Sequence, residues 1–167
     1  ANGATVANPG ALRPTVLSLV APVIELDGAI VNATATGNAN ASRIDIQAGE
    51  RLDLKDSHVA TDANRGNGGP VRVQAGRGIR LKNSAVTTSV SGDPGGNGGD
   101  IEVQTELLLL DNGFIQANTV ARGASGGDVR IDVGAVVAAG NRLMVGGDQP
   151  LRFNREGPRV NVIQAAA

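Results

Sequence analysis

The chain has 167 residues, with 15 basic and 16 acidic side chains and a formal net charge of −1, which argues against a binder of nucleic acid or anionic membranes. It contains no Cys, which excludes disulfide staples and thiolate metal sites. Hydrophobic residues make up 41% of the chain and are almost all aliphatic, and no apolar run approaches the about 18 residues that suggest a membrane-spanning helix. We therefore expect one folded domain with a thin aliphatic core.

One pattern recurs along the chain: a pair of alternating aliphatic residues, a polar step, a second such pair, and a turn. The first core residues of the copies, at spacings of 27, 27, 30 and 28 residues, are Leu17, Ile44, Val71, Ile101 and Val129. Alternation with period two predicts β-strands with one buried face. Each copy holds two clear short strands and a weaker third, which predicts one coil of a parallel β-helix per copy.

The predicted elements follow the copies in chain order. Residues 1–15 lack alternation and are interpreted as an N-terminal cap, a linker or a truncated coil. Residues 16–133 are the β-helix repeats, about five coils of 27–30 residues with three short strands each. Residues 134–167 are a degenerate last coil and a C-terminal cap, with candidate strands at 143–145, 151–153 and 160–163. Because the chain starts at Ala1, we expect a processed chain or an excised fragment.

If the coils stack in register, equivalent side chains lie about 4.8 Å apart and form columns. The predicted amide column is Gln47, Gln74 and Gln104, and the predicted threonine column is Thr34, Thr61, Thr88 and Thr119. The outward column Asp45, Arg72, Glu102 and Arg130 alternates in sign, which supports this register because opposite charges on neighbouring strands stabilise a sheet. Two further outward columns are Glu25, Asp53, Arg80 and Leu109, and Asp27, Lys55, Lys82 and Asp111.

The turns between copies are rich in Gly, Asn and Asp, at residues 66–69, 92–100 and 122–128. We interpret these glycines as corner residues that supply positive φ. The run GGNGGD at residues 95–100 is similar to a calcium-binding nonapeptide, so Asp93, Asp100 and Asp128 are the candidate calcium ligands. The corner interpretation is preferred, and no metal site is assigned.

The segment from Gly96 to Ile131, which contains GNGGDIEV, LLLLDNGFIQANT and GASGGDVRI, resembles a known repeat type. These repeats belong to the filamentous-haemagglutinin-like exoproteins that bacteria export by two-partner secretion. The resemblance covers about residues 16–133. It implies a right-handed, single-stranded parallel β-helix, export from a Gram-negative-type bacterium, and an extended stalk or an adhesive surface.

Two groups of side chains suggest catalysis, and each also has a structural interpretation. His58, the only histidine, follows Asp56 and Ser57, but the members of a Ser-His-Asp triad meet through the fold and are rarely sequence neighbours. We therefore interpret His58 as an exposed corner residue. Glu25 and Asp53 fall one coil apart in the predicted register, which is compatible with the about 5 to 9.5 Å between glycosidase carboxyl groups, but also with a solvated ladder.

The sequence thus predicts a structural, non-catalytic segment of a secreted or cell-surface exoprotein: an adhesin, a stalk or a filament subunit. We assign no catalytic residue and no cofactor. Expected partners are a second copy of the chain, end to end, other parts of a longer exoprotein, or a host or cell-surface glycan. Neither nucleic acid nor membrane insertion is expected.

Two other functions stay open. One is a polysaccharide-active lyase or hydrolase on the same fold, which paired carboxylates in a groove would favour. The chain has no Trp or Tyr, so only Phe114 and Phe153 could stack against a sugar there. The other is a glycan- or host-protein-binding adhesin module, which a flat, exposed Thr or Asn array would favour.

Overall fold

The computed structural model describes residues 5–7, 15–92, 95–119, 121, 124–140, 142–157 and 159–166. Every regular element in these ranges is a β-strand, and every strand pairing is parallel. The strands are β1 (Thr5–Ala7), β2 (Val16–Asp27), β3 (Ile30–Ala35), β4 (Arg43–Lys55), β5 (His58–Ala63), β6 (Val71–Ala75), β7 (Gly78–Val90), β8 (Ile101–Thr119), β9 (Val129–Ala138), β10 (Leu143–Val145) and β11 (Asn161–Ala166). The predicted all-β, parallel architecture is confirmed.

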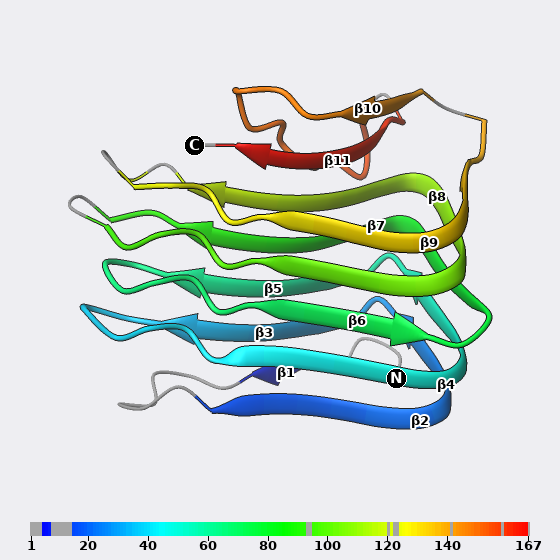
Figure 1. Ribbon diagram of the computed structural model, residues 1–167, viewed down its shortest axis with the longest axis horizontal. Helices are drawn as coiled ribbons and strands as arrows, with labels where there is room; N and C mark the ends of the chain where they lie inside the picture. Colours follow the sequence, from blue (N-terminus) through cyan, green and yellow to red (C-terminus); the bar gives the residue numbers. More distant parts are fainter. Residues whose placement is uncertain are drawn as a thin grey trace.

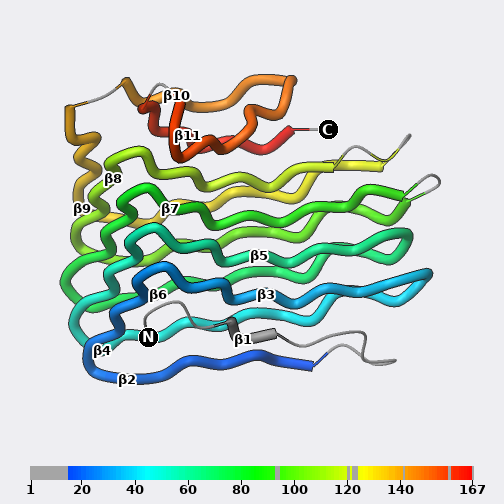
Figure 2. The backbone as a smooth tube through the Cα atoms, turned by 180° about the vertical axis from the view of Figure 1, so that it is seen from behind, coloured from blue at the N-terminus to red at the C-terminus, as the bar shows by residue number. Residues whose placement is uncertain are grey.

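The chain winds as a right-handed β-helix. In Figure 1 the coils rise from β2 to β9, with β2, β4 and β6 running to the right at the front and β3 and β5 returning to the left behind them. Figure 2 shows the returning strands from the opposite side. Four coils are complete, and β9 begins a fifth, in agreement with the prediction of about five.

Each coil has three faces, numbered here in chain order. Face 1 contains residues 16–21, 43–48, 71–75, 101–105 and 129–133. Face 2 contains residues 23–27, 51–55, 78–82, 107–111 and 135–138. Face 3 contains residues 30–35, 58–63, 85–90, 114–119 and 161–166. Some strands continue around the corners, and β8 covers all three faces, so the predicted short strands are partly merged.

The core lies inside the coils and consists of stacked aliphatic columns. The five first core residues, from Leu17 to Val129, pair in the predicted register. In the middle coils the inward side chains are fully enclosed, with Ile44 at 0% and Leu81 at 1% exposure. Burial of each such side chain stabilises the fold by about 1.5 to 3 kcal/mol, so alternation along each strand fixes which face points inward.

The outward charge columns also fall in the predicted registers. The guanidinium of Arg72 lies 2.7 Å from the carboxylate of Glu102 in the next coil, and the ammonium of Lys55 lies 2.9 Å from that of Asp27. These pairs are exposed, so each contributes at most about 1 kcal/mol and mainly favours one register over its alternatives.

The predicted threonine column is wrong for two of its four members. Thr61 pairs with Thr88 as expected, but Thr34 pairs with Asp62 rather than with Thr61. Thr119 lies two positions beyond the residue that pairs with Thr88. A single continuous threonine ladder therefore does not form.

The corner between faces 1 and 2 explains the error at Thr34 and one of the two positions at Thr119; the other arises because Thr119 follows its first core residue by 18 positions, whereas the other threonines follow theirs by 17. It contains two residues in the second and third coils, at 49–50 and 76–77, but only one in the first and fourth, Pro22 and Glu106. A count from the first core residue therefore runs one position out of register on face 3 whenever the corner changes length. The sequence pattern alone did not reveal this change.

A polar ladder that the sequence analysis did not identify closes the corner between faces 2 and 3. Asp56, Asn83 and Asn112 have φ of 49°, 47° and 57°, the left-handed conformation that Asn and Asp tolerate better than most residues. The amide of Asn83 donates to Asp56 Oδ1 at 3.2 Å, and that of Asn112 donates to Asn83 Oδ1 at 3.3 Å. The same side chains thus form the turn and tie three coils together.

Two buried serines support this corner from the inside. The N–H of Ser57 donates to Ser84 Oγ at 3.0 Å, and the hydroxyl of Ser84 donates to the carbonyl oxygen of Lys82 at 2.7 Å. Both serines are 0% exposed. The hydroxyl column therefore satisfies backbone groups that water does not reach.

Replacing Ser84 with alanine is expected to lower the free energy of unfolding by about 1 to 3 kcal/mol, because the buried N–H of Ser57 loses its acceptor. The measurement is urea denaturation. The matched control is Ser89→Ala. Ser89 is half-buried and donates to Asp62 on the outer side of face 3, so this substitution should lower the free energy of unfolding by less than about 1 kcal/mol. Equal losses in the two variants would contradict this role of Ser84.

The top of the stack departs from chain order on face 3. β11 pairs with β8, and β10, which precedes β11 in the chain, pairs with the outer edge of β11. Figure 1 shows β11 between β8 and β10. Face 3 therefore has two layers above β8, whereas faces 1 and 2 have only β9. Of the candidate strands near this end, 143–145 is β10 and 160–163 overlaps β11, but 151–153 is not a strand.

The segment between β10 and β11, called the strap (residues 146–157 and 159–160), covers part of the outer side of face 3. Leu151 and Phe153 of the strap pack against Phe114 and its neighbours on face 3. The amide of Gln116 donates to the carbonyl oxygen of Leu151 at 2.9 Å. The two hydrophobic residues of segment 151–153 therefore pack onto the sheet, and the segment does not join it as a strand.

Candidate functional site

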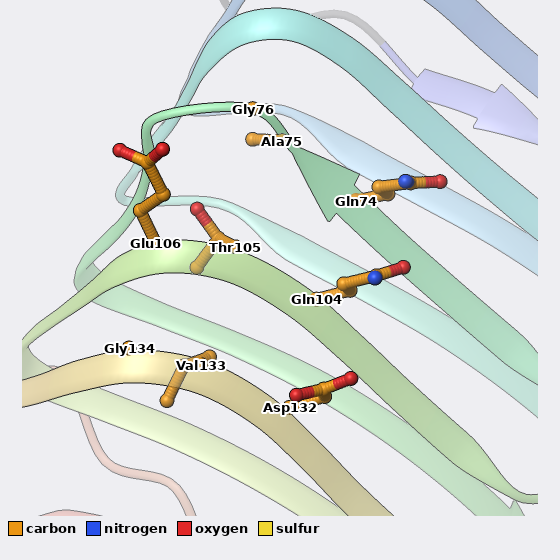
Figure 3. A pocket seen from close by; sticks show the side chains of 9 residues that line it. All are labelled: Gln74, Ala75, Gly76, Gln104, Thr105, Glu106, Asp132, Val133 and Gly134. Atoms are coloured by element: carbon orange, nitrogen blue, oxygen red, sulfur yellow. The ribbon is translucent and has the colours of Figure 1, made fainter.

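A shallow groove at the corner between faces 1 and 2 contains two members of the predicted amide column, Gln74 and Gln104. Figure 3 shows Gln74, Gln104 and Asp132 projecting from three successive strands, with Glu106 at the corner beside them. The groove has a volume of about 370 Å³. Gln47, Gln74 and Gln104 pair in the predicted register, so the amide column is confirmed.

The groove is open because glycines lie on either side of Glu106 in the stack. A Cβ at Gly76 would lie 2.4 Å from the carbonyl oxygen of Gly49, so close stacking of the coils requires glycine there. Thr105, which also lines the groove, is 7% exposed, and its hydroxyl has no hydrogen-bond partner in the structure. Glu106 was not identified from the sequence. It could have been found by aligning the copies, because a long charged residue stands there where the neighbouring copies have Gly76 and Gly134.

This site offers amide and carboxylate groups that can donate to and accept from a hydroxylated ligand. The exposed Gln104, Glu106 and Asp132 belong to two successive coils, β8 and β9. Glu106 and Asp132 place two carboxylates in this groove, the feature that the enzyme alternative requires, and the amide beside them suits the binding of sugar hydroxyls.

The candidate catalytic pair Glu25 and Asp53 lies one coil apart, as predicted. Arg51 bridges the pair: its Nη2 lies 2.7 Å from Glu25 Oε1, and its Nε donates to Asp53 Oδ2. Both carboxylates therefore bind one guanidinium on an exposed face, and this contact joins two successive coils.

The Ser-His-Asp neighbours do not converge. Ser57 faces the core, the carboxylate of Asp56 accepts from Asn83, and His58 points outward on face 3. The expectation of an exposed His58 is wrong, because the side chain is half-buried and its Nε2 lies 2.9 Å from Thr87 Oγ1 in the next coil. The histidine therefore takes part in coil stacking.

Burial lowers the pKa of His58 below its ordinary value; nearby Asp62 opposes this shift, and Arg155 adds to it. Below the ordinary pKa of 6.5, the unfolded chain binds a proton that the folded chain resists. The free energy of unfolding should therefore fall as the pH drops below 6.5 toward the lowered pKa.

The measurement is the urea midpoint at about pH 7.5 and about pH 5. The variant His58→Gln keeps a polar side chain on face 3 and should lose the part of the pH dependence that this histidine causes. An identical pH dependence in the variant would contradict the assignment.

The prediction that the corner glycines supply positive φ is wrong, because none of those described in the three predicted glycine-rich runs between faces 3 and 1 has a positive φ; close stacking of the coils requires them instead. This corner is held by asparagines. Asn67 N–H donates to Asn40 Oδ1 at 2.8 Å, and Asn97 N–H donates to Asn67 Oδ1 at 3.0 Å. One coil higher, Ser125 N–H donates to Asn97 Oδ1 at 3.2 Å. The asparagine of each Gly-Asn-Gly corner thus bonds to the backbone of the coil above.

Two of the three candidate calcium ligands, Asp100 and Asp128, lie next to each other in successive coils. Asp128 N–H donates to Asp100 Oδ1 at 2.9 Å, so this carboxylate supports the corner. Asp93 lies outside the described residues. No group of three or more His, Cys, Asp and Glu side chains that could share a metal ion occurs in the described part of the chain.

The two aromatic residues contact each other rather than a groove. The rings of Phe114 and Phe153 meet edge to face, with centroids 5.0 Å apart, and Phe114 is 1% exposed. Phe114 is therefore not accessible to a sugar. Within the ranges that the structure describes, no helix is long and apolar enough to cross a membrane.

Comparison of the chain with protein-family models, with curated proteins and with solved structures finds no match.

Proposed function

We propose that the chain is a rigid, non-catalytic segment of a secreted or cell-surface bacterial exoprotein, and that it serves as a stalk or adhesin scaffold. The supporting observation is the set of polar columns that bond from coil to coil at two corners. Asn40, Asn67 and Asn97 bond in series at one corner, and Asp56 and Asn83 bond at another. Side chains used in this way stiffen a scaffold and are not free for chemistry.

The location at a bacterial surface is supported by the resemblance of the repeats to exported exoproteins. The test is protease treatment of intact cells of the source bacterium, followed by mass spectrometry of the released peptides. Peptides of this chain should be released without those of a cytoplasmic marker. Peptides found only after cell lysis would contradict the proposed location.

The non-catalytic role is tested separately with the purified chain on a panel of acidic and neutral polysaccharides. No new reducing ends or unsaturated products should form. The variant Glu25→Gln with Asp53→Asn is the control. Product formed by the wild type and not by this variant would support the enzyme alternative, since it would assign catalysis to that pair.

The arrangement of β10 and β11 disfavours the assembly of copies by simple end-to-end stacking. If β2 of a second copy were added to the free edge of β9, its β3 would fall in the layer that β10 occupies on face 3. Its β1 would fall in the layer of β11. We therefore favour a stalk or adhesin segment over a subunit of an end-to-end filament.

The second candidate function is a glycan-binding adhesin module, which the groove of Figure 3 favours. Gln104, Glu106 and Asp132 are exposed and could bond to sugar hydroxyls. Binding of a glycan array probe that is lost in Glu106→Ala, with the fold unchanged, would support this function. An array without binding would count against it.

A further inference from the structure

A second groove, separate from that of Figure 3, lies on face 2, where charged side chains give way to aliphatic ones. In the lower coils the outward residues include Arg51 and Asp53. In the upper coils the corresponding positions are Leu107 and Leu109. The groove between them has a volume of about 270 Å³, and its polar and apolar parts meet at Gly78.

Gly78 leaves this groove open without a structural need for glycine. It pairs with Arg51 below and Leu107 above, so its missing side chain is a gap in an outward column. A Cβ there would have only ordinary contact, 3.6 Å from the carbonyl oxygen of Leu107, and φ is not positive. At Gly76, by contrast, a Cβ would lie 2.4 Å from backbone. Glycine weakens a strand, and it often marks a place where a ligand approaches closely.

Two cations at the groove have no acidic partner. Arg77 and Arg80 are exposed and form no ion pair in the described part of the chain. Of the two carboxylates that line the groove, Asp53 is bonded to Arg51, which leaves only Glu50 nearby. The groove therefore presents two unpaired guanidinium groups beside an aliphatic wall.

The backbone around the groove is fully used in coil stacking. β7 pairs with β4 on one side and with β8 on the other at these positions. A partner therefore cannot add as a further strand here, and recognition depends on side chains alone. The matching chemistry is a carboxylate for the guanidinium groups and an aliphatic group for the leucines.

We propose that this groove docks a segment of a partner protein that presents an acidic side chain next to an aliphatic one. The carboxylate binds Arg77 or Arg80, and the aliphatic group lies over Gly78 against Leu107 and Leu109. A peptide fits better than a glycan, because the side chains of Leu107 and Leu109 match an aliphatic side chain and offer no hydrogen-bonding group to sugar hydroxyls. This inference does not depend on the proposed stalk function.

The test is a nuclear magnetic resonance titration of the isotope-labelled chain with three probes. The first is the capped peptide Asp-Leu-Asp-Leu, the second is the same peptide with Lys in place of Asp, and the third is an oligogalacturonate. The acidic peptide should shift the amide signal of Gly78 and the Nε signals of Arg77 and Arg80. The basic peptide should leave these signals unchanged.

Two variants and one control locate the binding. Gly78→Val fills the gap, and Arg80→Gln removes one cation. Each substitution should therefore raise the dissociation constant of the acidic peptide by at least about tenfold. Arg130→Gln removes the same charge from face 1 and should bind as the wild type does. The thermal midpoint of Gly78→Val should not fall, since a side chain fits there.

Three outcomes would overturn the proposal. The first is an acidic peptide that leaves the Gly78 signal unshifted, and the second is equal binding by wild type and Gly78→Val. The third is a shift caused by the oligogalacturonate alone, which would assign the groove to an anionic glycan instead.

Discussion

Replacing Gly99 with alanine is expected to lower the free energy of unfolding by about 3 kcal/mol, a large share of the stability of a domain of this size. A Cβ at Gly99 would lie 2.2 Å from the carbonyl oxygen of Gly69 in the coil below. Gly127 stacks on Gly99 in the same way, since its Cβ would lie 2.0 Å from the carbonyl oxygen of Gly99. Backbone atoms of the coils below and above leave residue 99 no room to move, so the added methyl group of the variant has to push the coils apart.

The measurement is urea denaturation, and the matched control is Gly78→Ala. This control adds the same methyl group to a glycine of the same stack, but its nearest neighbour would be at 3.6 Å. It should raise stability by about 0.5 to 1 kcal/mol, because alanine loses less backbone entropy on folding. A Gly99→Ala variant as stable as the control would show that the corner does not need glycine.

Truncation of Leu108 or Leu110 to alanine is expected to cost about 2 to 5 kcal/mol each. Both side chains are 0% exposed and lie in the aliphatic columns of face 2. Leu109, between them, points outward and is half-buried, so Leu109→Ala should cost less than about 1 kcal/mol. The four consecutive leucines at 107–110 thus include two core residues in alternation.

The same denaturation series measures this alternation directly. If the four leucines were helical or irregular, the losses in free energy of unfolding would not alternate from one leucine to the next. Similar losses at Leu108, Leu109 and Leu110 would contradict the inward and outward assignment, and with it the register of β8 on its neighbours.

The regular part of the fold could be predicted because burial acts on every second residue of every coil. The aliphatic pairs, such as Ile44 with Ile46, repeat often enough to fix strand, face and coil length together. The charge columns could be predicted for the same reason, since Arg72 opposite Glu102 follows directly from the register. These features depend on local pattern and on a constant repeat.

Features that depend on a change in the repeat were missed or wrong. A one-residue difference at the corner before face 2 moved Thr34 out of the predicted column and accounts for one of the two positions by which Thr119 misses it. The ladder of Asp56, Asn83 and Asn112 was missed, because three turn residues show their common left-handed conformation only once the coils are aligned in space. The polar groove was found only in part, since the amide column was visible and Glu106 was not.

The C-terminal arrangement could not have been predicted from pattern alone. The segments 143–145 and 151–153 are both short and contain large hydrophobic residues, yet only the first becomes a strand. Leu151 and Phe153 instead pack against the outer side of the sheet, where Phe114 provides an apolar contact. Which edge a short strand joins depends on the whole stack.

The inverted order of β10 and β11 constrains the order in which these strands can fold during synthesis. Each lower coil can settle on its predecessor as soon as it emerges. β10 emerges earlier than β11, yet its only described pairing is with β11. β10 therefore has to wait for a later strand, and this layer cannot form by vectorial growth.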